Sequence, residues 1–273
     1  MPEQGARLRS ELREGFGLAA ARASGRPAIG TWLKLDTSET VEIAALAGLD
    51  FVIIDLEHAM IGTQTLNAML AVAYGNGIEA LVRVADHTGS TARIVLDNGA
   101  AGIVVPNVDS AEQARAIVAT HRFAPWGARG LSTSARAGAW GTGGVQEYMR
   151  SQNEDTSLFL QIESVVAVEA AASIGRVPGV DGLLVGPMDL AASSAAAGHE
   201  PARVRALLET LERTCAEHDI YLGTAAGPGR QQAQDLVARG YQLLAMSTDS
   251  TMLRIAATAL RDAASPASDA PTR

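Results

Sequence analysis

Two acidic side chains in the second half of the chain could hold a cation. Glu163 follows the apolar run 157–162, and Asp189 comes shortly after the apolar run 180–185. No cysteine or histidine stands beside either acid, and two carboxylates of this kind suit a hard, octahedral ion such as Mg²⁺ or Mn²⁺. Acids at such positions also cap helices, so the spacing alone leaves both roles open.

A second group of polar side chains follows two apolar runs in the first half. Asp55, Glu57 and His58 come at the end of the run Phe-Val-Ile-Ile. An imidazole oriented by neighbouring acids is a candidate proton-transfer group, although such a histidine also serves as a hydrogen-bonded structural residue. Arg83 ends another apolar run, where an unpaired charge is costly. It should therefore meet a protein acid such as Asp55, a substrate anion or an enolate oxygen.

Eight short apolar runs alternate with stretches that carry apolar residues at helical spacing. This alternation predicts a parallel sheet, and eight such units close into a (β/α)8 TIM barrel, whose typical length of roughly 250 residues is close to the 273 here. A doubly wound sheet fits less well because no Gly-rich phosphate turn follows the first run. The predicted strands are 28–34, 51–55, 79–84, 101–106, 157–162, 180–185, 220–225 and 241–246. The predicted helices are 39–47, 62–74, 89–97, 109–120, 164–174, 202–217, 229–239 and 250–264.

Three segments lie outside this alternation. An opening helix at about 5–22 precedes the first unit and could cover the barrel floor. The longest connection, roughly 122–156, is rich in Gly, Ala, Ser and Arg, and a loop of that length is usually functional. Residues 265–273 have no periodicity, which predicts a disordered tail. We therefore expect one barrel domain over residues 1–264.

Charge and composition argue against several kinds of partner. A formal net charge of −8, with no block of Lys or Arg to oppose it, disfavours nucleic acid and membrane surfaces. The only cysteine, Cys215, cannot form an internal disulfide, and no apolar run reaches the length of a membrane span, so we expect a cytoplasmic protein. Lys34 is the only lysine among 22 basic residues, and it is the one candidate for Schiff-base chemistry.

Barrel enzymes carry their active sites at the carboxyl ends of the strands. Five of the predicted strands end in residues that could contribute to such a site, and these ends should converge on one cavity. The residues are Trp32 and Lys34 on the first strand, Asp55, Glu57 and His58 on the second, Arg83 on the third, Gln161 and Glu163 on the fifth, and Gly186, Pro187 and Asp189 on the sixth.

Motifs at successive strand ends closely resemble the HpcH/HpaI aldolase family, the metal-dependent aldolases that cleave 4-hydroxy-2-oxo acids to pyruvate and an aldehyde. The resemblance spans nearly the whole predicted barrel, and the motifs stand in the family's order. They are Gly30-Thr31-Trp32, Asp55-Leu56-Glu57-His58, Arg83, Leu96-Asp97-Asn98-Gly99, Val105-Pro106, Ala111-Glu112-Gln113-Ala114-Arg115, Gln161-Ile162-Glu163-Ser164 and Gly186-Pro187-Met188-Asp189-Leu190.

The resemblance implies a cofactor and a substrate pocket. Glu163 and Asp189 would bind a divalent ion, Mg²⁺, Mn²⁺ or Co²⁺. The amides around Gly186, Pro187 and Met188 would receive the carboxylate of the 2-oxo acid. The remaining substrate-binding residues implied are Gln161, Trp32 and Arg136, the last of which would meet a charged group on the aldehyde or is a solvent-exposed loop arginine.

The resemblance also implies a reaction. The 2-oxo acid would chelate the ion, which stabilises the pyruvate enolate formed when the C3–C4 bond breaks. Arg83, near Asp55, would add a second positive charge at the enolate oxygen. His58, paired with Asp97 of the same or a neighbouring subunit, would position a metal-bound water or hydroxide that takes the C4 hydroxyl proton. A homo-oligomer is implied, a hexamer built as a trimer of dimers.

The sequence departs from the family pattern around the pocket. Leu56 stands where many relatives have Gly or Met, and Met188 is larger than the residue that often precedes the second ligand, so it is expected to narrow the pocket. The segment 191–198 is unusually rich in Ala and Ser, which leaves the preferred substrate open.

Three other functions compete with the metal-dependent aldolase. A lyase acting on a CoA thioester of the malyl or citramalyl type would use a similar metal pair, but no basic cluster marks a groove for the nucleotide. A Schiff-base aldolase would use Lys34 and leave the carboxylate pair without a task. A non-catalytic barrel that binds small acids would bind pyruvate without exchanging its methyl protons.

Overall fold

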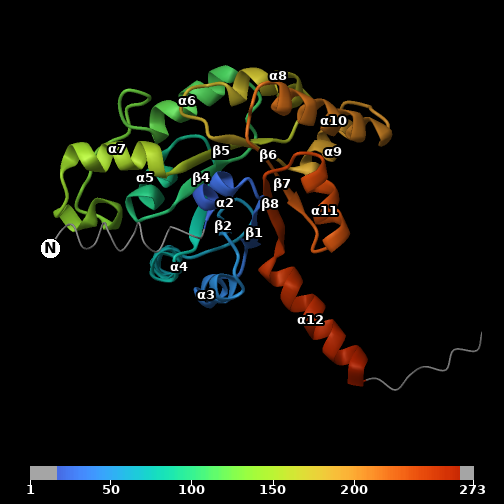
Figure 1. Cartoon of the computed structure of the whole chain (residues 1–273), viewed down its shortest axis with the longest axis horizontal. Coiled ribbons are helices and arrows are strands. Elements are labelled where there is room, and N and C mark those ends of the chain that lie inside the picture. Colours follow the sequence, from blue (N-terminus) through green and yellow to red (C-terminus); the bar gives the residue numbers. More distant parts are fainter. Residues whose placement is uncertain (1–16, 265–273) are drawn as a thin grey trace, which may run out of the picture.

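The computed structural model describes residues 17–264, in which eight parallel strands close into a barrel surrounded by helices (Figure 1). The predicted (β/α)8 fold is confirmed, and each predicted strand is present. The strands are β1 (Ala28–Leu33), β2 (Phe51–Asp55), β3 (Glu79–Arg83), β4 (Gly102–Val105), β5 (Ser157–Ile162), β6 (Gly182–Val185), β7 (Leu222–Ala226) and β8 (Leu243–Thr248). The helices that follow them in the predicted pattern are α3 (Glu39–Leu46), α4 (Thr63–Asn76), α5 (Ser90–Asp97), α6 (Ala111–His121), α8 (Val165–Gly175), α10 (Ala202–Glu217), α11 (Arg230–Ala238) and α12 (Asp249–Ala264).

The strands are apolar on both faces because each face is buried. One set of side chains fills the barrel, with Phe51, Leu81 and Phe159 among its largest members. The other set, including Ile54, Leu160 and Val185, packs against the surrounding helices. Burial on both sides turns the expected alternation into continuous apolar runs, which is why the strands could be recognised from the sequence.

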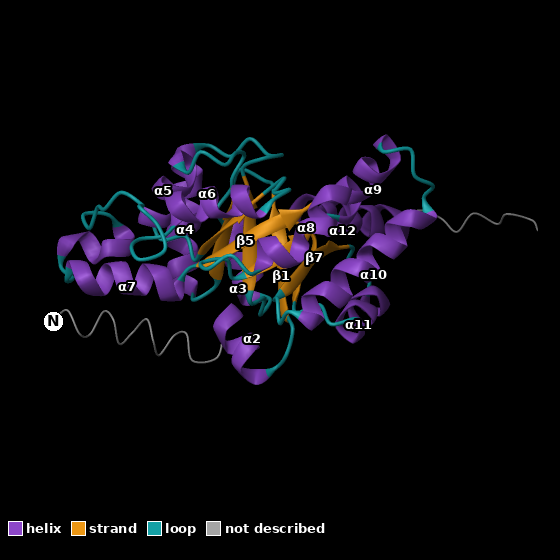
Figure 2. Cartoon of the chain, turned by 90° about the horizontal axis from the view of Figure 1, so that it is seen from above, coloured by secondary structure: helices purple, strands orange, loops and turns teal. Residues whose placement is uncertain are grey.

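The amino ends of the strands are covered by α2 (Leu18–Ser24), which lies beneath the barrel (Figure 2). Leu18 and Ala21 pack into the interior cluster, and the Leu18 N–H donates to Glu79 Oε1 at 3.1 Å. The described part of the predicted opening helix thus lies at the barrel floor. Residues 5–16 of that prediction, and the predicted tail 265–273, lie outside the described residues.

The long connection 122–156, expected as a loop, contains the 3-10 helix η1 (Arg136–Gly141) and α7 (Val145–Asp155). Two buried arginines hold it to the barrel. Arg122 donates to Thr156 O at 2.9 Å and pairs with Asp181, while Arg129 pairs with Asp97. The connection is therefore an ordered layer with its own helices, and its Gly- and Ser-rich composition hid them.

An extra helix, α9 (Pro187–Ala196), also escaped the sequence analysis. It begins directly after β6, with Pro187 in its first turn, where a fixed φ and a missing N–H cost nothing. The Ala- and Ser-rich segment 191–198 therefore begins within a helix that starts at the barrel mouth.

The last helix, α12, extends away from the ring of helices (Figure 1). Its start is fixed to β1, because Asp249 accepts hydrogen bonds from the Lys34 and Leu35 N–H groups at 3.0 Å. Beyond that point its apolar side chains face solvent, with Leu260 75% exposed. Leu46 on α3 is likewise 81% exposed. Within residues 17–264, no helix has the length and apolar character needed to span a membrane.

Candidate active site

The carboxyl ends of β1, β2 and β3 carry a buried ion-pair cluster centred on Asp55. The register of β2 and β3 places Asp55 opposite Arg83, whose Nε and Nη2 donate to the two carboxylate oxygens at 3.0 and 2.7 Å. Lys34 Nζ lies 3.0 Å from Oδ2, and the Glu57 and His58 N–H groups each donate to Oδ1 at 3.1 Å. Of the partners expected for Arg83, a protein acid or a substrate anion, the structure therefore shows the protein acid Asp55.

Asp55 keeps its charge although its side chain is fully buried. Burial works against the carboxylate, but the hydrogen bonds and charge of Arg83, aided by Lys34, outweigh it and lower the pKa to about 2. The Arg83 guanidinium also stacks on the Trp32 ring, with 4.5 Å between Cζ and the ring centroid. Asp55 and Trp32 therefore fix the position of the arginine at the barrel mouth.

Glu57 and His58 extend this cluster toward solvent. Arg83 Nη1 lies 2.9 Å from Glu57 Oε2, and His58 Nε2 lies 3.8 Å from the same oxygen. The His58 side chain is 55% exposed, so it is open to solvent. Glu57, which the sequence analysis noted only as a strand end, links the arginine to the histidine.

The ends of β5 and β6 carry the two predicted metal ligands. Gly186 follows β6 beside Glu163, and a Cβ added to this glycine would lie 2.9 Å from Glu163 Oε1 and 3.4 Å from Asp189 Oδ2. The two carboxylates therefore both lie close to Gly186, and a side chain at this position would push Glu163 aside. Gln161 Nε2 donates to Glu163 Oε1 at 2.8 Å, and the Asn107 N–H donates to Oε2 at 2.9 Å.

The charge of Glu163 is poorly compensated. Its pKa is raised to about 7, first by burial and then by the negative charges of Asp189 and Glu57, while the Asn107 N–H and the more distant Arg83 lower it only in part. Two neighbouring carboxylates in this state gain from a cation between them. The Glu163 environment therefore differs sharply from that of Asp55.

These residues fit a hard divalent cation. Within the described part of the chain, no three His, Cys, Asp or Glu side chains gather closely enough to hold a metal by themselves. A cation at Glu163 and Asp189 would thus need further oxygen ligands from water or substrate, as such ions commonly do. Gln161 Oε1, buried beside Glu163 and without a hydrogen-bond partner among residues 17–264, is a further oxygen acceptor at this point.

The first turn of α9 can bind an anion, but not with all the predicted amides. Pro187 has no N–H, and the Gly186 N–H already donates to Ile162 O at 3.3 Å. The N–H groups of Met188 and Asp189 are the ones that helix geometry leaves without an intrahelical partner. Met188 is 85% exposed, and its expected narrowing of the pocket stays a prediction.

Two predicted residues do not join the mouth of their own chain. Asp97 ends α5, which runs back toward the amino end of the barrel, and it binds Arg129 and the Tyr148 hydroxyl, the latter at 3.2 Å. Arg136 lies in the outer helical layer, where Nη2 is 3.4 Å from Asn67 Oδ1. Neither residue therefore contacts His58 or Glu163 within one chain.

Asn107 is the residue at the site that the sequence analysis missed. It follows β4 with φ 57°, in the left-handed region that asparagine tolerates better than most residues. This conformation presents its N–H to Glu163. An asparagine directly after Val105-Pro106 was the available signal, because it marks a turn at a strand end.

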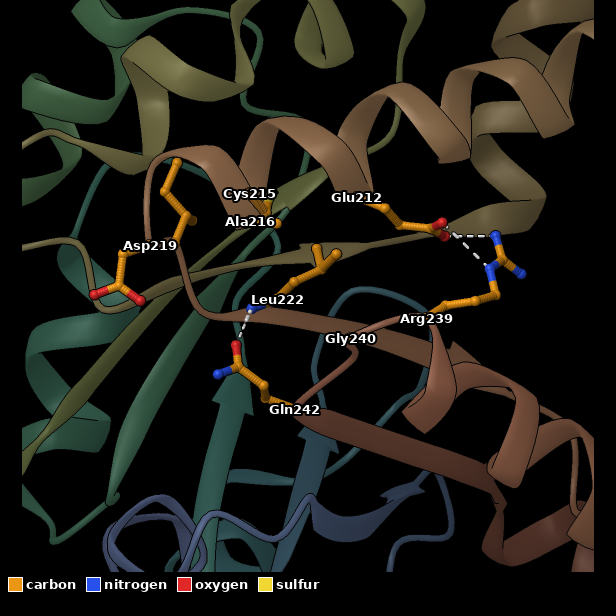
Figure 3. Close-up of a pocket in the computed structure, with 9 residues that line it drawn as sticks. Glu212, Cys215, Ala216, Asp219, Leu222, Arg239, Gly240 and Gln242 are labelled. Atoms are coloured by element: carbon orange, nitrogen blue, oxygen red, sulfur yellow. Dashed lines mark hydrogen bonds and ion pairs between the residues drawn. The ribbon is translucent and has the colours of Figure 1, made fainter.

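A cavity of about 130 Å³ lies at the opposite end of the barrel (Figure 3). It is lined by Cys215 of α10 and by residues around the amino ends of β7 and β8, and the Glu212–Arg239 ion pair closes one side. Burial, followed by the charge of Glu212, raises the pKa of Cys215 to about 12, so its thiol stays protonated. This cavity lies away from the strand ends where barrel enzymes react.

Comparison with known proteins agrees with this geometry. Residues 28–256 match the family described as HpcH/HpaI aldolase/citrate lyase. A 2-keto-3-deoxy-L-rhamnonate aldolase of Salmonella gallinarum (strain 287/91 / NCTC 13346) is 38% identical over 232 residues, which are 82% of this chain and 84% of that protein.

Solved structures give the same result. An HpcH/HpaI aldolase from Desulfitobacterium hafniense DCB-2 has a TM-score of 0.83 and 29% identity, covering 94% of this chain and 100% of that one. The citrate synthase SbnG has a TM-score of 0.78 and 26% identity, with 90% and 97% covered. The chain therefore belongs to the HpcH/HpaI aldolase/citrate lyase family, and it is a carbon–carbon lyase of the metal-dependent aldolase class.

Proposed function

We propose that the barrel mouth cleaves a 4-hydroxy-2-oxo acid to pyruvate and an aldehyde, and forms it in the reverse direction. The observation that carries this proposal is the pair Glu163 and Asp189, which both lie close to Gly186 beside the fixed Arg83 cation. The 38% identity to a 2-keto-3-deoxy-L-rhamnonate aldolase supports a hydroxylated sugar-acid type of substrate.

Glu163 and Asp189 would hold the divalent ion, Mg²⁺, Mn²⁺ or Co²⁺. When bound there, such an ion draws electron density from the 2-oxo acid and so eases cleavage of the C3–C4 bond. Gln161 would hold substrate beside it, and the Met188 and Asp189 N–H groups would bind the carboxylate of the 2-oxo acid. Trp32 forms the wall below Arg83.

Arg83 and His58 would act on the reacting atoms. Asp55 and Glu57 hold the guanidinium in place, so its charge is already oriented when the negative charge develops on the keto oxygen. His58, beside Glu57 and open to solvent, would accept the C4 hydroxyl proton, either directly or through water. Neither Arg83 nor His58 would need to move from its observed position to take these roles.

Lys34 is poorly suited to the rival Schiff-base mechanism. Its Nζ lies 3.0 Å from the buried Asp55 carboxylate, so attack on a carbonyl would take this nitrogen out of an ion pair. Borohydride in the presence of pyruvate should therefore leave the protein unmodified. A stable adduct on Lys34 would support the rival.

Replacement of one proposed ligand tests the function. Glu163→Gln should lower kcat/KM on the order of 10³-fold in aldol addition of pyruvate to a panel of aldehydes with Mn²⁺, because several kcal/mol of transition-state stabilisation are lost. The matched control is Glu169→Gln, the same change on the exposed face of the following helix. Equal activity of the two variants, or methyl-proton exchange that survives EDTA, would rule the mechanism out.

We further propose a homo-oligomer, a hexamer built as a trimer of dimers. The projecting apolar face of α12 and the exposed apolar residues of α3 support contact with a second copy. Asp97 and Arg136 lie on the outer side of their own barrel, so they could reach His58 and the aldehyde only at a neighbour's mouth. Light scattering should give a multiple of the 28.3 kDa chain mass, and a monomer at micromolar concentration would contradict this.

A further inference from the structure

The peptide unit between Pro106 and Asn107 lies between a histidine and the proposed metal ligand Glu163. His87 Nε2 is 2.6 Å from Pro106 O, and the Asn107 N–H donates to Glu163 Oε2 at 2.9 Å. Because the Pro106 carbonyl can only accept, the histidine must carry its proton on Nε2. The carbonyl and the N–H belong to one planar amide, so both hydrogen bonds act on a single rigid group.

Hydrogen bonds at the two ends of an amide reinforce each other. Donation to the carbonyl oxygen increases the polarity of the N–H on the same unit, and within a protein this cooperativity is on the order of 10–30% per bond. The His87 donor therefore strengthens the bond from Asn107 to Glu163. It also fixes the plane of the amide, and with it the direction in which the N–H points.

The surrounding backbone gives this peptide few other supports. The strand β4 ends at Val105, and Asn107 follows it with φ 57°, outside the regular strand pairing. The next backbone bond is from the Val108 N–H to Gln161 O at 3.3 Å. His87 is half-buried in the β3–α5 loop, so it reaches the peptide from a neighbouring strand end. Removal of its ring would leave the Pro106 carbonyl without this donor.

We propose that His87 is a positioning residue of the cation site: through the Pro106–Asn107 peptide it orients the Glu163 carboxylate and strengthens cation binding there. This inference rests on the proposed function, because it takes Glu163 as a ligand. Groups that hold a metal ligand in place commonly contribute 10–100-fold to metal affinity. His87 needs no contact with substrate or cation to have this effect.

The test measures metal affinity rather than turnover. His87→Leu removes the donor, and it should raise the Mn²⁺ dissociation constant of the full chain about tenfold, as measured by calorimetry or by electron paramagnetic resonance. His87→Gln, which can place an amide N–H near the same carbonyl, should restore affinity to within about threefold of wild type. The control is His218→Leu on the exposed end of α10, which should not change the affinity.

A second readout examines the peptide without metal. In the metal-free protein, the Asn107 amide proton resonance should move upfield in His87→Leu and return toward its original position in His87→Gln, because the shift follows hydrogen-bond strength. An unchanged dissociation constant in a folded His87→Leu protein would overturn the proposal. Equal losses in the Leu and Gln variants would also overturn it, since ring packing would then be what matters. If wild type bound no Mn²⁺, the proposed function would fail. The chemical shift of the Asn107 amide proton would then decide alone whether His87 acts on Glu163 through the Pro106–Asn107 peptide.

Discussion

Two buried carboxylates at the same barrel mouth have opposite electrostatic environments. Asp55 receives hydrogen bonds or ion pairs from Arg83, Lys34 and two backbone N–H groups, and its pKa is lowered to about 2. Glu163 receives one side-chain amide and one backbone N–H, both uncharged, and its pKa is raised to about 7. The first carboxylate is part of a complete ion-pair network. The second forms no ion pair within residues 17–264, and the charge of Arg83 compensates it only in part.

The two environments indicate different roles for Asp55 and Glu163, the first structural and the second chemical. A buried charge that is fully paired holds Arg83 in one place, and removal of either partner would leave an uncompensated charge. A buried charge without a counter-charge costs stability and is a mark of a functional site. The ends of β1 to β3 thus form a complete ion-pair network, and the ends of β5 and β6 carry the pair of carboxylates that we propose as cation ligands.

Arg83→Met should have the largest effect on stability. It leaves Asp55, which has no solvent exposure, with only Lys34 and the two backbone N–H groups, so the free energy of unfolding should fall by about 3 kcal/mol. Urea denaturation at pH 7 measures this loss. Arg150→Met, the same change at an exposed arginine on α7, should leave the midpoint unchanged. Equal urea midpoints for the two variants would mean that the ion-pair network around Asp55 does not contribute to the stability of the fold.

Glu163→Gln should act in the opposite direction in the metal-free protein. Since folding raises the pKa of Glu163 from 4.5 to about 7, the folded state holds a proton that the unfolded state has lost between these values, and stability falls as pH rises through this window. The neutral amide avoids that cost. At pH 8 the variant should be more stable than wild type by at most about 3 kcal/mol, with no difference below pH 4.

A bound metal ion should reverse the order of stability of wild type and Glu163→Gln. Saturating Mn²⁺ should raise the melting temperature of wild type at pH 8 and leave Glu163→Gln nearly unchanged, because only the wild-type folded state binds the ion tightly. Thermal scans with and without EDTA give both results. A metal-free variant less stable than wild type at pH 8 would show that the Glu163 charge is already compensated within the chain.

The sequence was sufficient for the barrel and for much of the site. Strands buried on both faces gave unambiguous apolar runs, and the polar residues that end them, such as Arg83 and Glu163, could be placed at one mouth by the parallel topology alone. Residue type alone could not distinguish Asp55 from Glu163, because both are acids at strand ends, and only the family resemblance assigned the metal to Glu163. Their difference comes from cross-strand register and from backbone donors, which depend on the closed fold.

Other parts depended on long-range contacts. The helix α7 was hidden in a Gly- and Ser-rich connection, whose order comes from Arg122 and Arg129 reaching across the chain. Asp97 lies at the far end of α5, away from the barrel mouth of its own chain, so the proposed pairing with His58 would need a neighbouring copy. Asn107 has no charged side chain that would mark it as a site residue in the sequence, yet its backbone N–H donates to Glu163.

Substitution of Asn107 should give the smallest change in stability, and it tests the backbone conformation that directs an N–H at Glu163. Its φ of 57° is accessible to glycine without strain and costs alanine on the order of 1 kcal/mol. Both Asn107→Gly and Asn107→Ala remove the same side chain, so the difference between them isolates the backbone strain. Asn107→Ala should be less stable than Asn107→Gly by at most about 1 kcal/mol in urea denaturation, because the greater entropy of the unfolded glycine variant offsets part of the strain. If alanine were tolerated as well as glycine, the left-handed conformation of Asn107 would not strain the fold. The Asn107 N–H, which donates to Glu163, would then be much less constrained than the donors around Asp55.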